Sequence, residues 1–432
     1  MDFIKEILIP GIKRNQSLET LVYKNLPISR WKADGSQSLF KELLQPLRVL
    51  THLNLSFDTG IYRETFIYLA RFARQLQQLK IPSISICHRT DEEEQGEADT
   101  PELEQTQLRH LELGSFDFLE EHLLFIPLLK ASPELRGLGL PSFQHENTQL
   151  VTQVIRDNCP KLTNINLERT HFCLNDDDVA EIIGVCRRSG LRSIQFNRGL
   201  RPNSIAALCS YTTTLGSVKI PAYGPGSVQA ALHLLRSCPT LRVLKMLTEE
   251  LNGRDIGIFS AKDLLEDPWV CMELEIFSIP IVDVFNRTAD EHIREDIDVG
   301  HVVHYDYHQQ FYTQLSKLTK LQELSVGISR NCLKSTKTSV LFSLESGLAI
   351  LSELKNMRLL DVSSTMARIG RKELRWMYDH WPQLEFIKNE NVGNCNPWER
   401  SFSEDGDDTP LTEELLTLLR YDPDPLADWI YD

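Results

Sequence analysis

A short histidine-rich stretch is the strongest candidate for metal chemistry in the sequence. In HVVHYDYHQQF, His301, His304 and His308 would share one face of a helix, and Asp306 lies between the last two. Imidazole and carboxylate groups at this spacing can bind zinc. The stretch leads directly into FYTQLSKLTKLQEL, whose apolar spacing predicts a helix of its own. We therefore expect a solvated, histidine-rich insertion without a metal, and we keep a metal-dependent protein as an alternative.

Cysteines and catalytic motifs give no better candidate for chemistry. The nine cysteines form no Cys-x-x-Cys pair, and GxSxG, HExxH, phosphate-loop and GxGxxG motifs are all missing from the sequence. An odd number of scattered cysteines is typical of a reduced protein, so we expect a cytoplasmic or nuclear location. We expect neither an enzyme nor a bound cofactor.

Composition narrows the class of partner. The chain has 432 residues, of which 41% are hydrophobic, and its net charge is −15. This charge argues against a nucleic-acid backbone or an anionic membrane as the main partner. The sequence contains no run of 18 apolar residues that would cross a bilayer, and MDFIKEILIPGIKRNQ lacks the pattern of a secretory signal. A protein partner is therefore expected.

The elements that would position such a partner come from a repeated pattern, Leu-x-x-Leu-x-Leu with other apolar residues allowed. The spacing of its last two positions turns both side chains to one face of a strand. Thirteen copies begin at Leu18, Leu50, Leu76, Leu108, Leu135, Leu162, Leu191, Leu215, Leu241, Leu274, Leu321, Met357 and Leu384. Between Leu108 and Leu241 they recur every 24 to 29 residues, a period that predicts a solenoid.

Helix patterns lie between the strand motifs. In NDDDVAEIIGVCRRSG, Asn175 can cap the start of a helix and Gly190 can close its end, and Val179, Ile182, Ile183 and Cys186 form one apolar face. Residues 226–239 repeat the arrangement, with Val228, Ala231, Leu232 and Leu235 on the apolar face. The cysteines at the inner ends of these helices, Cys159, Cys186, Cys209 and Cys238, are interpreted as structural.

These motifs carry a resemblance to a known family. The strands, the acidic helix start in LNDDDVAEII and the Cys-Pro-x-Leu junction resemble the cysteine-containing leucine-rich repeats of F-box/LRR proteins. Segments 262–279, 343–362 and 369–387 are similar to the C-terminal repeats of fungal F-box/LRR-like proteins. The resemblance implies an α/β horseshoe solenoid like that of ribonuclease inhibitor, with a parallel concave sheet and a mostly helical convex side.

The resemblance also implies a protein-recognition surface. The leading hypothesis is a non-catalytic scaffold for protein–protein interactions. The alternative is a substrate receptor of a Skp–cullin–F-box ubiquitin ligase, with a Skp adaptor as a second partner if the chain holds a cryptic F-box. Residues 1–40 contain no LPxEIL-type start of an F-box, so that module would be missing or degenerate.

Three irregular segments interrupt the pattern. We expect a solenoid over residues 1–395, with an acidic loop near 91–105 and an insertion near 283–308. Residues 396–432 form an acidic tail, in which Leu411, Leu415 and Leu419 predict a helix that caps the last repeat.

The candidate binding site lies in the second half of the concave sheet. Residues between the buried positions of each motif point to this face. The predicted partner-binding residues are Val243, Lys245, Leu247, Ile276, Ser278 and Pro280. Val243, Leu247, Ile276 and Pro280 are apolar, which is unusual on a solvent-exposed sheet face. Two explanations stay open: a partner binds these residues, or the insertion near 283–308 covers them.

Overall fold

A computed structural model describes the chain over most of its repeats. The described residues are 8–26, 33–57, 61–81, 86–87, 103–114, 124–170, 174–222, 224–247, 259, 261–281, 305–326, 340–362 and 369–388. Most of the acidic loop, the insertion up to residue 304 and the whole tail lie outside these ranges. The chain divides into two compact units, unit 1 (Met1–Thr214) and unit 2 (Leu215–Asp432).

Unit 1 contains a parallel sheet whose strands follow their order in the chain. These strands are β1 (Thr20–Leu26), β2 (His52–Phe57), β4 (Gln78–Ile81), β6 (His110–Leu113), β7 (Gly137–Gly139), β8 (Asn164–Leu167) and β9 (Ser193–Phe196). The α-helices of this unit are α1 (Ile9–Arg14), α2 (Ala33–Leu44), α3 (Arg63–Phe72), α4 (Ile126–Lys130), α5 (Thr148–Asn158), α6 (Asp176–Gly184) and α7 (Pro202–Cys209). A short parallel pair, β3 (Ile61–Tyr62) and β5 (Ile86–Cys87), forms a second sheet.

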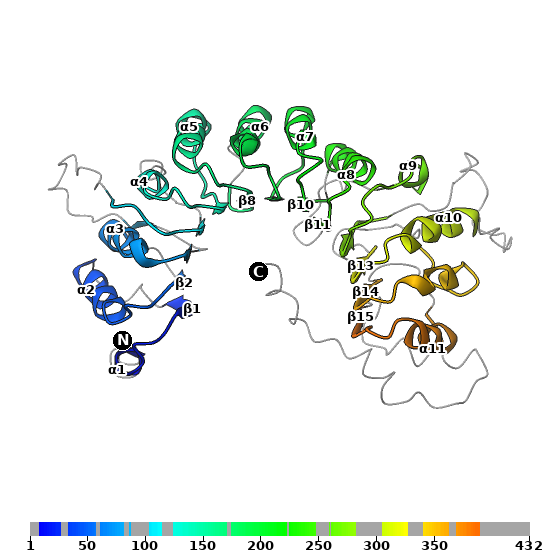
Figure 1. Ribbon diagram of the computed structural model, residues 1–432, viewed down its shortest axis with the longest axis horizontal. Helices are drawn as coiled ribbons and strands as arrows, with labels where there is room; N and C mark the ends of the chain where they lie inside the picture. Colours follow the sequence, from blue (N-terminus) through cyan, green and yellow to red (C-terminus); the bar gives the residue numbers. More distant parts are fainter. Residues whose placement is uncertain are drawn as a thin grey trace, which may run out of the picture. The chain divides into compact units, whose positions relative to one another are not determined.

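Unit 2 repeats the design. Its sheet consists of β10 (Ser217–Pro221), β11 (Val243–Leu247), β12 (Ile276–Ser278), β13 (Glu323–Ser325), β14 (Leu359–Asp361) and β15 (Phe386–Lys388), again parallel and in chain order. Its α-helices are α8 (Pro225–Ser237), α9 (Ala261–Leu265), α10 (Tyr305–Ser316) and α11 (Arg371–His380). Figure 1 shows that the helices of each unit lie on one face of its strands. None of the described helices is long and apolar enough to cross a membrane.

The thirteen sequence motifs coincide with the thirteen strands of the main pattern, so the predicted α/β class and parallel pairing are confirmed. Equal motif positions pair across neighbouring strands, as in Leu138 with Ile165 and Leu244 with Phe277. In most strands, as in β8 and β11, the apolar motif positions are buried on the helix side and the residues between them are half-buried. The exceptions are β1, where Val22 is exposed, and β7, where the glycines between the motif positions are buried. We call the sheet face opposite the helices the helix-distal face.

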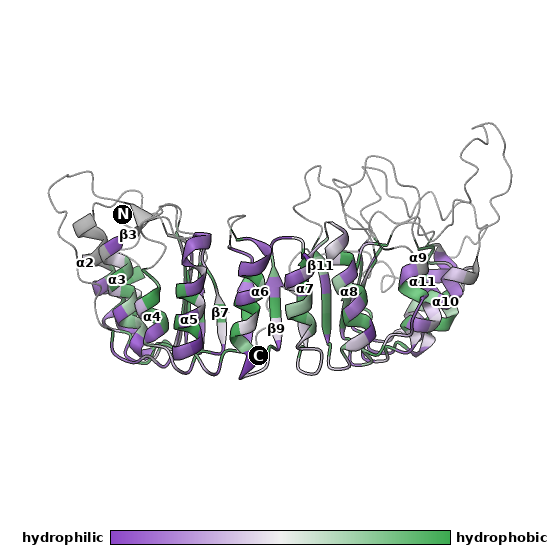
Figure 2. Cartoon of the chain, turned by 90° about the horizontal axis from the view of Figure 1, so that it is seen from above, coloured by the Kyte–Doolittle hydropathy of each residue, from purple (hydrophilic) through white to green (hydrophobic). Residues whose placement is uncertain are grey.

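The helix predictions are confirmed with one correction. Asn175 caps α6 by accepting a hydrogen bond from the Asp178 amide at 2.9 Å, and Gly190 adopts a left-handed conformation with φ of 77°. In α8, Val228, Ala231 and Leu235 are buried as expected. Leu232 is only half-buried, because the packed stripe of this helix passes through Leu234 instead. Figure 2 shows hydrophobic and hydrophilic residues side by side on α5 and α6, as expected of helices with one packed face.

Candidate protein interface

Four of the six predicted partner-binding residues form two neighbouring pairs on the helix-distal face of unit 2. Val243 on β11 pairs in register with Ile276 on β12, and Lys245 pairs with Ser278. All four are half-buried and alternate along their strands with fully buried core residues. The structure therefore brings together the central residues that the motif spacing placed on one face.

The apolar positions continue beyond the residues that the sequence analysis selected. Ile276 pairs with Glu323, Glu323 with Leu359, and Leu359 with Phe386. We call the resulting line across β11–β15 the apolar row; its members are Val243, Ile276, Leu359 and Phe386, with Glu323 between the two halves. Parallel strands lie about 4.8 Å apart, so the row extends over roughly 19 Å. Leu359 and Phe386 could have been included from the sequence, because they occupy the same motif position as Val243.

Glu323 belongs to the site but is not among the predicted partner-binding residues. Its carboxylate lies 4.0 Å from the Lys245 ammonium group, and this ion pair reaches across β12. The two side chains are 17% and 36% exposed, so solvent screens the attraction and the pair is worth less than about 1 kcal/mol. A second pair of this kind joins Lys388 to Asp361 at 3.9 Å. The charges beside the apolar row are therefore balanced within the face itself.

The remaining two predicted residues differ from each other. Leu247 is half-buried at the end of β11 and lies on the same face as Val243 and Lys245. Pro280 is buried, and its carbonyl oxygen accepts a hydrogen bond from the Phe259 amide at 3.4 Å. Residues 259 and 281 form an isolated parallel bridge beside it. The prediction of Pro280 as an accessible binding residue is therefore wrong, because its side chain is buried.

The histidine-rich stretch is only partly described. His301 and His304 lie outside the described residues, and the side chain of Asp306 is not described. His308 belongs to α10, which begins at Tyr305, at the C-terminal end of the predicted insertion. The expectation of a solvated His308 is wrong, because its ring is fully buried with its centre 6.5 Å from that of Tyr312. Among the described residues no group of three ligand side chains is arranged to hold a metal ion.

The four cysteines interpreted as structural lie at the junctions between helix and strand, as expected. Cys159, Cys186 and Cys238 are buried at the inner ends of their helices, and Cys209 is half-buried. Burial raises the pKa of the Cys159 and Cys186 thiols to about 12, which keeps both protonated and unreactive near neutral pH. Their packing between helix and strand accounts for their positions without any redox or metal chemistry.

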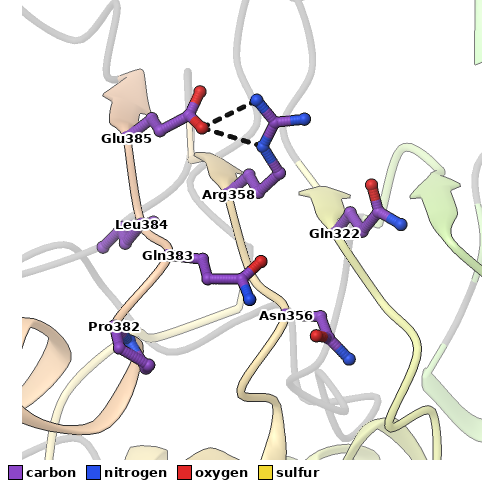
Figure 3. Close-up of a pocket in the computed structure, with 7 residues that line it drawn as sticks. All are labelled: Gln322, Asn356, Arg358, Pro382, Gln383, Leu384 and Glu385. Carbon is purple, nitrogen blue, oxygen red and sulfur yellow. Dashed lines mark hydrogen bonds and ion pairs between the residues drawn. The ribbon is translucent and has the colours of Figure 1, made fainter.

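A polar hollow lies at the N-terminal ends of β13, β14 and β15 (Figure 3). Its volume is about 550 Å³, and it is lined by Gln322, Asn356, Arg358, Pro382, Gln383, Leu384 and Glu385. Arg358 donates two hydrogen bonds to Glu385, at 2.9 and 2.7 Å, so its charged groups already satisfy each other. This lining offers amide groups for hydrogen bonding, and it brings together no nucleophile and base.

The fold and this face define the chain as an α/β repeat protein built from parallel strand–helix units. The architecture is compatible with a solenoid of the leucine-rich-repeat type. No model of a known protein family matches the sequence, and no curated protein matches it significantly.

Proposed function

We propose that the chain is a non-catalytic protein-recognition scaffold, a leucine-rich-repeat horseshoe solenoid whose partner binds the helix-distal face of unit 2. One observation carries this proposal: equal motif positions on β11, β12, β14 and β15 line up in register as the apolar row. Half-buried apolar side chains next to polar ones are the usual composition of a binding surface.

The rigidity of the sheet supports the same function. Each member of the apolar row is held on a strand whose neighbouring residues are buried, so its side chain loses little freedom when a partner binds. Apolar anchors surrounded by polar groups tend to dominate the free energy of binding. Val243, Ile276 and Leu247 are such anchors, and Lys245 and Ser278 beside them can orient a polar partner.

The proposal is tested by placing charge on the anchors. Leu247→Asp combined with Ile276→Asp is expected to abolish partner capture in affinity purification with mass spectrometry, while circular dichroism and the melting midpoint stay unchanged. Ser217→Asp with Ser325→Asp is the matched control, because it adds the same charge to the same face at polar positions. Partner capture at wild-type levels by the Leu247/Ile276 variant would contradict the proposal, and so would its unfolding, since these residues would then belong to the core.

The same purification addresses the ubiquitin-ligase alternative, which rests on the resemblance of the repeats to F-box/LRR proteins. A substrate receptor would capture a Skp-type adaptor, and the Leu247/Ile276 variant would retain that adaptor because an F-box lies apart from the repeats. A scaffold without an F-box would capture none.

A further inference from the structure

Two arginines lie side by side in unit 1, at the N-terminal ends of neighbouring strands. Arg109 precedes β6 and Arg136 precedes β7, and His110 pairs in register with Gly137 directly after them. The Arg136 amide donates to the Arg109 carbonyl at 2.8 Å, so the two backbones are in direct contact. Both side chains are exposed. Within the described part of the chain, neither guanidinium group has a hydrogen bond or an ion pair within 4.0 Å; the carboxylate that both charges act on is Glu134, which also binds Lys161.

A histidine ring lies next to this pair because β7 contains glycine. A Cβ atom on Gly137 would meet the His110 Nδ1 atom at 2.5 Å, so the imidazole occupies the space that a side chain would otherwise fill. The ring is therefore held over β7, close to the strand that Arg136 begins. Any larger residue at position 137 would displace it.

The surroundings of His110 are strongly cationic. Burial lowers the pKa of the His110 imidazole, and the charges of Lys80, Arg136, His52 and Arg109 lower it further. These groups come from β2, from β4 and from the residues directly before β6 and β7, so four neighbouring repeats contribute charge to one place.

The acidic residues nearby are already engaged. Glu112 on β6 lies 3.7 Å from the Lys80 ammonium group, and both Glu134 oxygens accept hydrogen bonds from Lys161 at 2.6 Å. The bond from Lys161 lowers the pKa of Glu134, and the charges of Arg136 and Arg109 add to this effect, so Glu134 is shared between Lys161 and the two arginines. The chain as a whole has a net charge of −15, so this cluster opposes the general charge of the protein. Two adjacent guanidinium groups repel each other, and an anion bound between them would relieve that repulsion.

We propose that Arg109, Arg136 and His110 form a binding site for a side-chain carboxylate of an acidic segment in a partner protein. Guanidinium groups bind carboxylates through two parallel hydrogen bonds, and neighbouring arginines present such donors side by side. The bound carboxylate favours the protonated imidazole, so His110 becomes a further donor. That the acidic segment belongs to a partner protein rests on the proposed function, whereas the carboxylate site itself does not.

The test uses the purified full-length chain and a fluorescein-labelled peptide of twelve residues that contains six glutamates. Anisotropy at low salt is expected to show binding, and Arg109→Gln with Arg136→Gln is expected to weaken it about tenfold or more. Arg187→Gln with Arg188→Gln is the matched control, because it removes the same charge from two other exposed arginines of unit 1. In parallel, NMR titration of the His110 ring is expected to show that the peptide raises its pKa.

Three results would overturn the proposal. Equal weakening by both double variants would mean non-specific attraction. A second such result would be that the peptide binds neither the wild type nor Glu92→Gln/Glu93→Gln/Glu94→Gln, a variant with a less acidic loop. Binding that arises only in this loop variant would assign the arginines to the chain's own acidic segment instead of a partner. None of these measurements involves Leu247 or Ile276, so failure of this site and failure of the proposed function are distinguishable.

Discussion

At the residue scale, stability comes from buried apolar side chains that occupy the same motif position in successive repeats. Ile165 and Leu138 are register partners, 3% and 2% exposed, and each packs between the sheet and its helices. The residues beside them, such as Asn166, are half-buried on the opposite face. A substitution should therefore have very different effects at neighbouring positions of one strand.

Ile165→Asp is expected to lower the free energy of unfolding by about 3–5 kcal/mol, because it leaves an unpaired carboxylate in the core. Asn166→Asp is the matched control on the helix-distal face, and its effect should stay within about 0.5 kcal/mol. Urea denaturation followed by circular dichroism measures both. An unchanged midpoint for Ile165→Asp would show that the register of β8 is wrong.

His110 gives unit 1 a specific pH dependence. Its pKa in the folded chain lies below the ordinary value of 6.5, so the unfolded chain binds more protons as the pH falls. The stability that depends on the neutral imidazole is present above about pH 6.5 and is lost as the pH falls through the lowered pKa. We expect the stability of the wild type to fall more between pH 7.5 and pH 5.5 than that of His110→Asn. Parallel curves for the two proteins would contradict this prediction.

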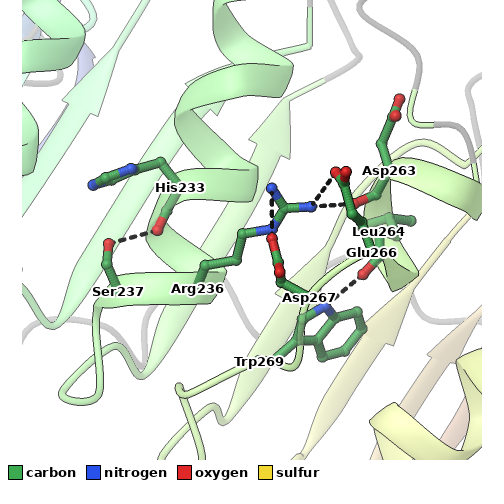
Figure 4. Close-up of polar contacts among 8 residues, drawn as sticks. All are labelled: His233, Arg236, Ser237, Asp263, Leu264, Glu266, Asp267 and Trp269. Carbon is green, nitrogen blue, oxygen red and sulfur yellow. Dashed lines mark hydrogen bonds and ion pairs between the residues drawn. The ribbon is translucent and has the colours of Figure 1, made fainter.

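At the element scale, neighbouring repeats are joined through the ends of their helices. The Asp176 carboxylate in α6 accepts hydrogen bonds from the Asn203 and Ser204 amides at the start of α7, at 2.8 and 3.1 Å. In unit 2, Arg236 in α8 donates to the Asp263 carbonyl of α9 at 2.6 Å and lies 3.2 Å from Asp267 (Figure 4). Such contacts satisfy groups at the helix ends that the helix cannot satisfy by itself.

Arg236→Gln tests the joint between α8 and α9. It removes a partly buried guanidinium group that contacts a carbonyl and two carboxylates, so we expect a loss of about 1–2 kcal/mol in the free energy of unfolding. Arg242→Gln is the control: Arg242 also pairs with a carboxylate, Glu275, but its side chain is 61% exposed and should contribute less than about 1 kcal/mol. Equal losses in thermal or urea denaturation would contradict the role of Arg236.

At the scale of the whole molecule, stability should be distributed along the chain. Repeat proteins depend mainly on contacts between adjacent repeats, so damage spreads to neighbours before it reaches distant strands. Buried thiols report on this behaviour in both units: Cys159 and Cys186 in unit 1, and Cys271 in unit 2. Burial raises the pKa of each to about 12, so each reacts slowly until its repeat opens.

Thiol labelling of Ile165→Asp, read by mass spectrometry, is the corresponding experiment. We expect Cys159 and Cys186 to react faster than in the wild type, because they lie in the repeats on either side of β8. Cys271 should keep its wild-type rate. Equal acceleration at all three positions would mean that the chain unfolds as one cooperative body.

The sequence by itself determined the local features of this protein. The positions of its strands, the cap at Asn175 and the left-handed Gly190 follow from residue types and spacings within one repeat, and the parallel pairing of the strands follows from the recurrence of the motif. The apolar row was largely predictable for the same reason, because a motif position fixes the face on which a side chain lies.

Only the tertiary structure decided the contacts between repeats that the motif register does not fix. The ion pair of Lys245 with Glu323 passes over a strand, His308 and Pro280 are buried, and the His110 ring lies over Gly137. These contacts join residues that are distant in the chain or packed by other elements. They depend on the distance between stacked strands and the reach of each side chain, which no local spacing in the sequence specifies.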